Sequence, residues 1–352
     1  MRIGMIANHA CIRVDKMALP LMDRGHEVHI ISRKDPAYRR YYTSRSRWDD
    51  LGQCLEAIKI YSEHVDVFHA HNEPSWFVTA VKERCDTPVV LDVHDSFLAR
   101  STPDEAEKRL EAGNYNIRVT SEERNNFQLA DALVFPGNRF ADIVCSEFKL
   151  TQPRTILPSY CTRRMQGYST QEWMGGLVYE GRVDLPKETT EDPQSHGFRY
   201  ADYHDFAKKA QDLGIDFHLY ARGDKEFLEV YESIALTHVP SPYEKLIGFL
   251  SRHDWGLVGN LEPTPEWDVA FPNKMFEYIS AGVPVVALNA GACGEWLRET
   301  GLGIEVETLE ELCERWSEHT QVRKRLLKNR QAWVMENHIE KLESVYSGLV
   351  SR

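Results

Sequence analysis

The stretch FPNKMFEYISAGVPVVALN (residues 271–289) decides the fold of this chain. Its second half, from Val283 to Asn289, is a short apolar run typical of a buried strand. In the first half, Pro272 and Gly282 stand where a helix begins and ends. Apolar residues recur at helical spacing between them. A helix that leads directly into a buried strand is typical of an α/β fold with a parallel sheet.

The same alternation continues in both directions along the chain. In the first half, the apolar runs predict strands at residues 2–8, 27–32, 65–71, 88–94, 132–137 and 154–159. Helices are expected there at 14–25, interrupted by Pro20, and at 51–62, 74–84, 103–112, 120–130 and 138–147. After an irregular segment at 158–174 the pattern restarts. Strands are then expected at 175–181, 216–223, 255–260, 283–289 and 302–306, with helices at 201–212, 242–252, 272–281 and 308–317.

The chain has 352 residues, and this length favours two domains over one. Residues 184–198 are polar and predict a surface loop. The last predicted helix, at 331–349, has an apolar stripe that must pack against another element. The stripe consists of Met335, Ile339, Leu342, Tyr346 and Leu349.

Composition excludes several classes of protein. The net charge is −12, and the second half carries most of it, because residues 1–160 hold 21 Lys and Arg against 23 Asp and Glu. An acidic chain has no general attraction for nucleic acid. No apolar run approaches the roughly 20 residues of a membrane-spanning helix, and no signal-peptide pattern opens the sequence, so we expect a cytoplasmic protein. The seven scattered cysteines predict free thiols.

The start of the predicted helix 272–281 is a candidate anion site. A helix N-terminus favours phosphate, and Lys274 adds a full positive charge in the first turn. Glu277 lies on the same face, where a carboxylate can accept hydrogen bonds from a ribose diol. Arg182, directly after a strand, could clamp a phosphate, with help from Lys187. The alternative is a surface Lys–Glu pair and a solvated arginine.

In the first half, Asp92, His94 and Asp95 end a predicted strand, where a His–Asp pair can orient an acceptor hydroxyl. A structural ion pair is the alternative. His69 and His71 also end a strand, but they lack an evident third ligand, so the sequence predicts no metal site.

Together these segments resemble family 4 retaining glycosyltransferases. In the second half the resemblance rests on PNKMFEYISAGVPVVA (272–287), GACGEWL (291–297) and GLG (301–303). In the first half it rests on NHACIRVDKMALPLMDRGHEV (8–28), LDVHDS (91–96) and ADALVFPG (130–137). The segments occur in the order of the family and cover nearly the whole chain.

The resemblance implies a GT-B fold, in which two Rossmann-like parallel-sheet domains face a cleft and the C-terminal helix crosses back to the first domain. The N-terminal acceptor domain would span 1–160, joined by the helix at 331–352, and the C-terminal nucleotide-sugar domain 175–330. The donor would be a nucleoside diphosphate sugar, of UDP or GDP type. Transfer would proceed with retention and without a metal or other cofactor. The acceptor would be a glycan, a lipid-linked sugar or another hydroxyl compound, as in polysaccharide biosynthesis.

The resemblance also implies roles for particular residues. Arg182 and Lys187 would bind the diphosphate, Glu277 the ribose, and His94 with Asp95 would lie near the reacting centre. Asn260, Phe271, Asn273 and Lys274 would complete the donor site, and Asn8 and Arg13 would contact the acceptor or a phosphate.

Two departures from the family pattern bear on function. Val269 stands where the family often has a first glutamate, and the glycine-rich loop after the first strand is absent. Two alternatives therefore remain: a catalytically inactive protein of this fold that binds or scaffolds, and a sugar-nucleotide epimerase. Residues 33–48 are rich in arginine and aromatic residues, and they could contact an anionic membrane surface peripherally. A solvated basic loop is the alternative.

Overall fold

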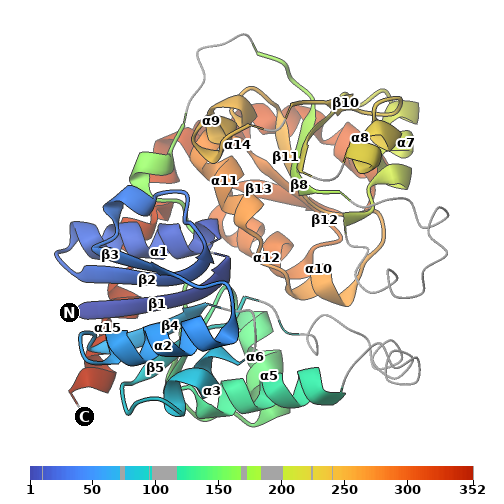
Figure 1. Cartoon of the computed structure of the whole chain (residues 1–352). Coiled ribbons are helices and arrows are strands. Elements are labelled where there is room, and N and C mark those ends of the chain that lie inside the picture. The colour runs from blue at the N-terminus through green and yellow to red at the C-terminus, as the bar shows by residue number, and fades with distance from the viewer. Residues whose placement is uncertain are drawn as a thin grey trace. The chain divides into compact units, whose positions relative to one another are not determined.

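The computed structural model describes residues 1–9, 11–71, 76–94, 96, 117–167, 173–183, 201–222, 225–239 and 241–351. The chain divides into two compact units. The first comprises Met1–Thr162 and Met335–Arg352, and the second comprises Arg163–Val334. In each unit helices flank a central sheet (Figure 1). The helix expected at 103–112 and the loop expected at 184–198 fall outside the described residues.

The sheet of the first unit has seven strands in the order β3-β2-β1-β4-β5-β6-β7. They are β1 (Arg2–His9), β2 (Glu27–Lys34), β3 (Ser44–Arg47), β4 (Val67–His71), β5 (Val89–Asp92), β6 (Ala132–Phe135) and β7 (Arg154–Ile156). Neighbouring strands run parallel. Every residue of β4, β5 and β6 is buried, as expected for strands covered on both faces.

The helices of the first unit are α1 (Ile12–Asp23), α2 (Leu51–Ser62), α3 (Phe77–Lys82), α5 (Ile117–Leu129), α6 (Asn138–Phe148) and α15 (Glu340–Val350). Helix α1 runs through Pro20, which lies in its last turn. Strand β3 was not predicted, because its sequence SRSR has no apolar pattern and it pairs only at the edge of the sheet, with β2.

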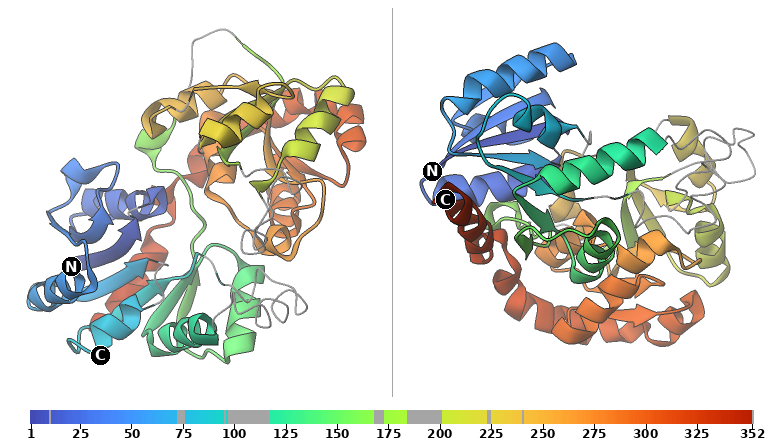
Figure 2. Two further views of the ribbon diagram at one scale, coloured as in Figure 1. Left: turned by 45° about the vertical axis from the view of Figure 1, so that its right-hand side comes forward. Right: turned by 90° about the horizontal axis from the view of Figure 1, so that it is seen from below.

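The single helix predicted at 331–349 is wrong. The chain there forms the short 3-10 turns Arg330–Trp333 and Met335–Asn337 before α15 begins at Glu340. The N–H of Met335 donates to the carbonyl of Cys161, so the backbone leaves the helical path. The predicted apolar stripe is nevertheless buried. Helix α15 packs on β4 and β7 of the first unit (Figure 2).

The second unit has a six-stranded parallel sheet in the order β10-β9-β8-β11-β12-β13. Its strands are β8 (Leu177–Arg182), β9 (Phe217–Arg222), β10 (Leu236–Thr237), β11 (Trp255–Gly259), β12 (Val285–Leu288) and β13 (Gly303–Val306). Its helices are α7 (His204–Asp212), α8 (Lys225–Tyr231), α9 (Tyr243–Leu250), α10 (Pro265–Val269), α11 (Asn273–Ala281), α12 (Gly291–Thr300), α13 (Leu309–Glu314) and α14 (His319–Asn329).

Helix α11 is the element predicted from the opening stretch. It begins at Asn273, so Pro272 precedes the helix as its cap rather than occupying its first position. Gly282 ends it with a φ of 75°, a left-handed conformation that glycine adopts without strain. In open α/β sheets, ligands bind beyond the carboxyl ends of the strands where the strand order reverses. These points lie between β1 and β4 in the first unit and between β8 and β11 in the second.

Candidate active site

The first unit holds a buried ion pair at the carboxyl end of its sheet. Asp92, the last residue of β5, accepts hydrogen bonds from Arg13 in the first turn of α1. The Arg13 Nε–Asp92 Oδ2 distance is 2.9 Å and the Nη2–Oδ1 distance is 2.7 Å. His71 Nδ1 and His94 Nε2 lie 3.1 Å and 2.6 Å from Asp92 Oδ2. Three side chains from separate parts of the first unit thus meet on one carboxylate.

Asp92 is fully buried, and its charge needs compensation. Burial alone would raise the pKa of Asp92, but Arg13 and His94 hold it well below its usual range. Arg13 is itself 2% exposed and also donates to the carbonyl of Leu157. Its charge is therefore paired with Asp92, and contact of Arg13 with the acceptor or a phosphate stays a prediction. Asn8, half-buried, lies near the end of β1.

His94 follows β5 and is half-buried. Its Nε2 bonds the carboxylate of Asp92, so the direction of the imidazole ring is set by a buried group that Arg13 also holds. The structure thus pairs His94 with the aspartate two residues before it. Asp95, expected to act with His94, lies outside the described residues.

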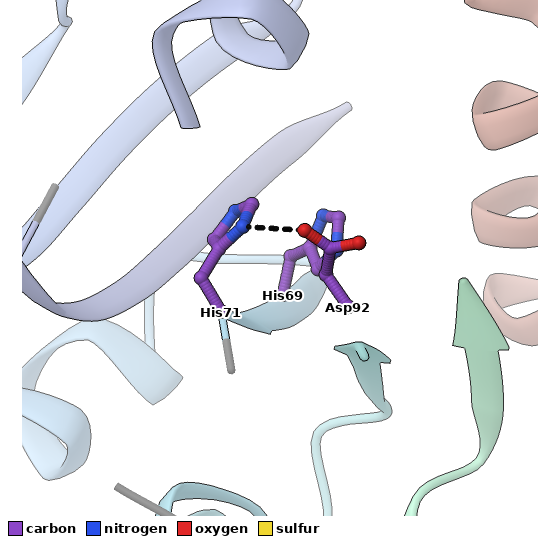
Figure 3. Close-up of side chains that lie close together, drawn as sticks. All are labelled: His69, His71 and Asp92. Atoms are coloured by element: carbon purple, nitrogen blue, oxygen red, sulfur yellow. Dashed lines mark hydrogen bonds and ion pairs between the residues drawn. The ribbon is translucent and has the colours of Figure 1, made fainter. Parts of the chain in front are cut away.

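His69, His71 and Asp92 lie close together, with one ligand-type atom of each within 4.8 Å of the others (Figure 3). The expectation that the two histidines lack a third neighbour of this kind is wrong. However, both oxygens of Asp92 already accept from Arg13, and a divalent cation would meet the guanidinium at short range. His69 Nδ1 bonds the hydroxyl of Tyr346 at 2.6 Å. The arrangement favours an ion-pair network over a metal centre.

In the second unit, Lys274 lies in the first turn of α11. Its Nζ is 3.7 Å from the centre of the Tyr179 ring and 5.9 Å from that of Trp267, so the aromatic faces stabilise the ammonium group. Burial lowers the pKa of Lys274 to about 8, although the carboxylates of Glu180 and Glu277 act to raise it. Lys274 is thus a cation at neutral pH that a bound anion would stabilise further.

Glu277 lies one turn further along α11 and is 3% exposed. Its Oε1 accepts a hydrogen bond of 2.9 Å from the hydroxyl of Tyr243, the first residue of α9. A buried carboxylate held by a hydroxyl donor differs from the solvated surface pair considered above.

Arg182 is the exposed last residue of β8. The preceding residue, Gly181, has a φ of 135°, and a Cβ there would lie 3.1 Å from Lys274 Nζ. Gly181 therefore lets the strand end approach Lys274 closely. Arg182 and the start of α11 thus belong to the same end of the sheet. Lys187 lies outside the described residues.

The other predicted donor-site residues have structural contacts. Asn260 donates to the carbonyl of Asp202 at 2.8 Å. Phe271 is half-buried and packs against Phe276 and Trp296 with ring centres 5.5 and 6.0 Å apart. Asn273, the first residue of α11, is half-buried.

Val269 is buried, and it provides no carboxylate at the position where the family often has a first glutamate.

Two residues of these clusters, Tyr179 and Tyr243, were not predicted as site residues. The ring of Tyr179 and the hydroxyl of Tyr243 come from strands and helices far from α11 in sequence. No spacing rule places them there, although a tyrosine near the end of a strand, such as Tyr179, is a signal that the sequence carries.

The basic segment 33–48 buries three of its four aromatic residues, and the fourth, Tyr41, is exposed. Tyr38, Tyr42 and Trp48 are buried, and Tyr42 donates a hydrogen bond to the buried Asp15. The arginines Arg39 and Arg45 both pair with Asp35. The segment thus lacks the row of exposed aromatic rings that would anchor it in a bilayer. Among the described residues, no helix combines the length and the apolar composition needed to cross a membrane.

Comparisons with known proteins agree with this architecture. Residues 12–159 match the family described as Glycosyltransferase Family 4. No match to the chain was found among curated proteins.

Solved structures resemble the chain over its full length. A sucrose-phosphate synthase from Thermosynechococcus elongatus superposes with a TM-score of 0.75 at 13% identity, covering 100% of this chain and 99% of its own. The HepE protein of Anabaena in complex with UDP gives a TM-score of 0.65 at 12% identity and covers both chains completely. The avilamycin glycosyltransferase AviGT4 gives 0.58 at 13% identity, over 100% and 98% of the two chains.

Two parallel-sheet units with these structural neighbours define the GT-B class of proteins. Within the first unit, residues 12–159 match the Glycosyltransferase Family 4 model, and the chain as a whole has the fold of the glycosyltransferase structures named above.

Proposed function

We propose that this protein is a retaining glycosyltransferase that moves a hexose-type sugar from a nucleoside diphosphate sugar to a hydroxyl acceptor without a metal. The observation that carries the proposal is the cluster at the start of α11. Lys274 and Glu277 lie there in one helical turn, beside the strand end that carries Arg182.

The cluster suits a nucleoside diphosphate. The N-terminus of α11 presents backbone N–H groups, and Lys274 adds a cation that aromatic rings hold in place. As the glycosidic bond breaks, negative charge grows on the departing diphosphate, and these groups stabilise it more than in the ground state. Glu277 has the chemistry to accept hydrogen bonds from the ribose hydroxyls.

We assign His94 to the orientation of the acceptor hydroxyl or the donor sugar, because Asp92 fixes the ring. No group among the described residues is assigned as a covalent nucleophile. We therefore propose same-face attack with the departing phosphate as the base, which gives retention. The fit of UDP in HepE concerns that protein, and it makes UDP a reasonable first donor nucleotide to test here.

The first experiment is a thermal-stability screen with UDP, GDP, ADP, CMP and TDP, with and without Mg²⁺ and with EDTA. A ligand at a hundred times its dissociation constant adds about 2.7 kcal/mol of stability. One nucleotide that stabilises the protein equally with Mg²⁺ and with EDTA supports the metal-independent donor site. Stabilisation only with Mg²⁺ would contradict metal independence, and if no nucleotide stabilises the protein under any condition, the protein is a binding or scaffolding member of the fold.

Transfer itself is tested with the Lys274→Ala and Glu277→Ala variants. We expect each to reduce kcat/KM for the donor about a hundredfold, roughly 3 kcal/mol of transition-state stabilisation. Lys328→Ala, which removes an exposed lysine of α14, is the control. Normal rates in both site variants would refute the donor site. Conversion of the donor sugar without an acceptor would instead indicate an epimerase.

For the acceptor, we propose a glycan or a lipid-linked sugar. Contact of 33–48 with a membrane would depend mainly on charge, because Tyr38, Tyr42 and Trp48 are buried and Tyr41 is the one exposed aromatic residue of the segment. The test of this membrane contact compares how tightly wild-type protein and an Arg39→Glu/Arg40→Glu variant bind anionic vesicles. Equal binding by the two proteins would exclude the membrane contact.

A further inference from the structure

The orientation of Glu277 is set by a residue of a different helix. Tyr243 begins α9, and its hydroxyl donates to Glu277 Oε1 at 2.9 Å. Helices α9 and α11 pack against each other, so the two ends of this hydrogen bond are held by the core of the second unit. Glu277 itself is almost completely buried, whereas Tyr243 is half-buried.

A carboxylate in such a place needs donors, because burial of an unpaired charge is costly. Lys274, one turn earlier on α11, supplies a positive charge nearby. Tyr243 supplies a directed hydrogen bond, which fixes the plane of the carboxylate in a way that a nearby charge alone does not. A carboxylate can accept about four hydrogen bonds, so the bond from Tyr243 is compatible with further donors from a ligand.

The hydrogen bond from Tyr243 joins the first turn of α9 to the carboxylate assigned to the ribose. This connection is made by tertiary packing across 34 positions of sequence.

We propose that Tyr243 is a positioning residue that orients Glu277 toward the ribose diol, and that it thereby makes the site select ribonucleoside over 2′-deoxyribonucleoside diphosphates. The inference rests on the proposed function, in which Glu277 binds the ribose. A site built to bond a hydroxyl rejects the analogue that lacks it, because the buried acceptor is left without its donor. A carboxylate that is free to turn loses this discrimination.

The test compares dissociation constants for two ligands, the nucleoside diphosphate that stabilises the wild-type protein most and its 2′-deoxy counterpart. The proteins are wild type, Tyr243→Phe and Tyr61→Phe. The last is a matched control, because it deletes a phenol hydroxyl that bonds Ser44 at 2.7 Å in the first unit. Hydrogen bonds to charged groups correspond to about tenfold or more in affinity. We expect wild type and Tyr61→Phe to prefer the ribonucleotide by at least that factor.

For Tyr243→Phe we expect about tenfold weaker binding of the ribonucleotide and nearly unchanged binding of the deoxyribonucleotide. A general loss of structure would weaken both ligands alike, and that result would overturn the inference. An unchanged preference in Tyr243→Phe would also overturn it and leave the donor site intact. If wild type binds neither ligand, the proposed function fails, and the inference fails with it.

A second variant tests the same inference in case Tyr243→Phe does not fold. Glu277→Gln keeps the shape of the side chain and removes the negative charge of the group to which the Tyr243 hydroxyl donates. We expect it to lose the preference for the ribonucleotide in the same way. A Glu277→Gln protein that keeps the wild-type preference would contradict the inference independently of Tyr243.

Discussion

At the scale of single residues, Lys274 shows how its surroundings set a chemical property. Burial disfavours the ammonium group, while Glu180, Glu277 and the ring of Tyr179 favour it. The resulting pKa of about 8 is far below that of a solvated lysine. A bound diphosphate would raise it, because a nearby anion favours the charged form.

The pH dependence of donor binding follows from this. Above pH 8 the free enzyme loses the proton of Lys274, so we expect the donor KM to rise up to about tenfold per pH unit, while kcat at saturation changes little. Initial-rate measurements of the donor KM and of kcat between pH 7 and 9.5 check this expectation. In Lys274→Arg the guanidinium stays charged, and the KM should remain flat over this range. A flat wild-type profile would show that Lys274 does not bind the diphosphate.

Asp92 is the second residue whose role is decided by its neighbours. Asp92→Asn removes the carboxylate charge that Arg13 requires and leaves a buried guanidinium without its counterion. We expect a loss of about 3–5 kcal/mol in the free energy of unfolding, measured by urea denaturation. The double variant Arg13→Met/Asp92→Leu should recover much of this loss, because no unpaired charge is then buried. If it is as unstable as Asp92→Asn, the cost arises from packing.

At the scale of elements, α15 belongs to the first unit although it comes last in the chain. Its Tyr346 is fully buried and bonds His69 on β4. Glu343 of α15 also contacts Arg24 and His26, which follow α1. The helix therefore ties the end of the chain to elements near its beginning.

Removal of one hydroxyl tests this attachment. Tyr346→Phe leaves the buried Nδ1 of His69 without its partner, so we expect it to destabilise the protein by about 1–3 kcal/mol. Tyr41→Phe removes an exposed hydroxyl and should stay within about 0.5 kcal/mol of wild type. Chemical denaturation of both variants measures the difference. Equal stability of the two would mean that the Tyr346–His69 bond contributes nothing net.

At the scale of the whole molecule, buried histidines make stability depend on pH. His218, His238 and His253 cluster in the second unit, with His218 Nδ1 2.9 Å from His238 Nε2 and the ring centres of His218 and His253 4.4 Å apart. Burial lowers the pKa of His218 to about 4 and that of His253 to about 3. In the first unit, burial also lowers the pKa of His69 and His71.

The sign of the effect follows from these shifts. The folded protein keeps the histidines neutral, whereas the unfolded chain binds protons below about pH 6.5. Stability present above that pH is therefore lost as the pH falls toward 4. At pH 5 His218, with its pKa of about 4, should cost about 2 kcal/mol.

Unfolding free energies at pH 7.5 and 5 measure this loss. His218→Phe should reduce the difference between the two pH values by about 2 kcal/mol, whereas His64→Phe, at an exposed position, should not change it. An unaltered difference in His218→Phe would place the acid sensitivity elsewhere.

Much of the fold and part of the candidate site were predictable from local patterns. Apolar runs marked the central strands of both sheets, since a strand covered on both faces must be apolar along its length. The edge strand Ser44–Arg47 and the 3-10 turns before α15 escaped prediction, because pairing at an edge and a backbone bond to Cys161 leave no periodic signal.

The sequence by itself determined the two α/β units, the helix Asn273–Ala281 to within one residue, and the pairing of a cation with a carboxylate on its first turns. These depend on spacing within a few residues, which the covalent chain imposes directly. Only the tertiary structure decided which groups those side chains meet. It placed Arg13 on Asp92, Tyr179 under Lys274 and Tyr243 on Glu277. Such contacts join segments between about 34 and 95 positions apart. They form because a buried charge without a partner is costly, and the packing of the core decides which groups lie close enough to serve as partners.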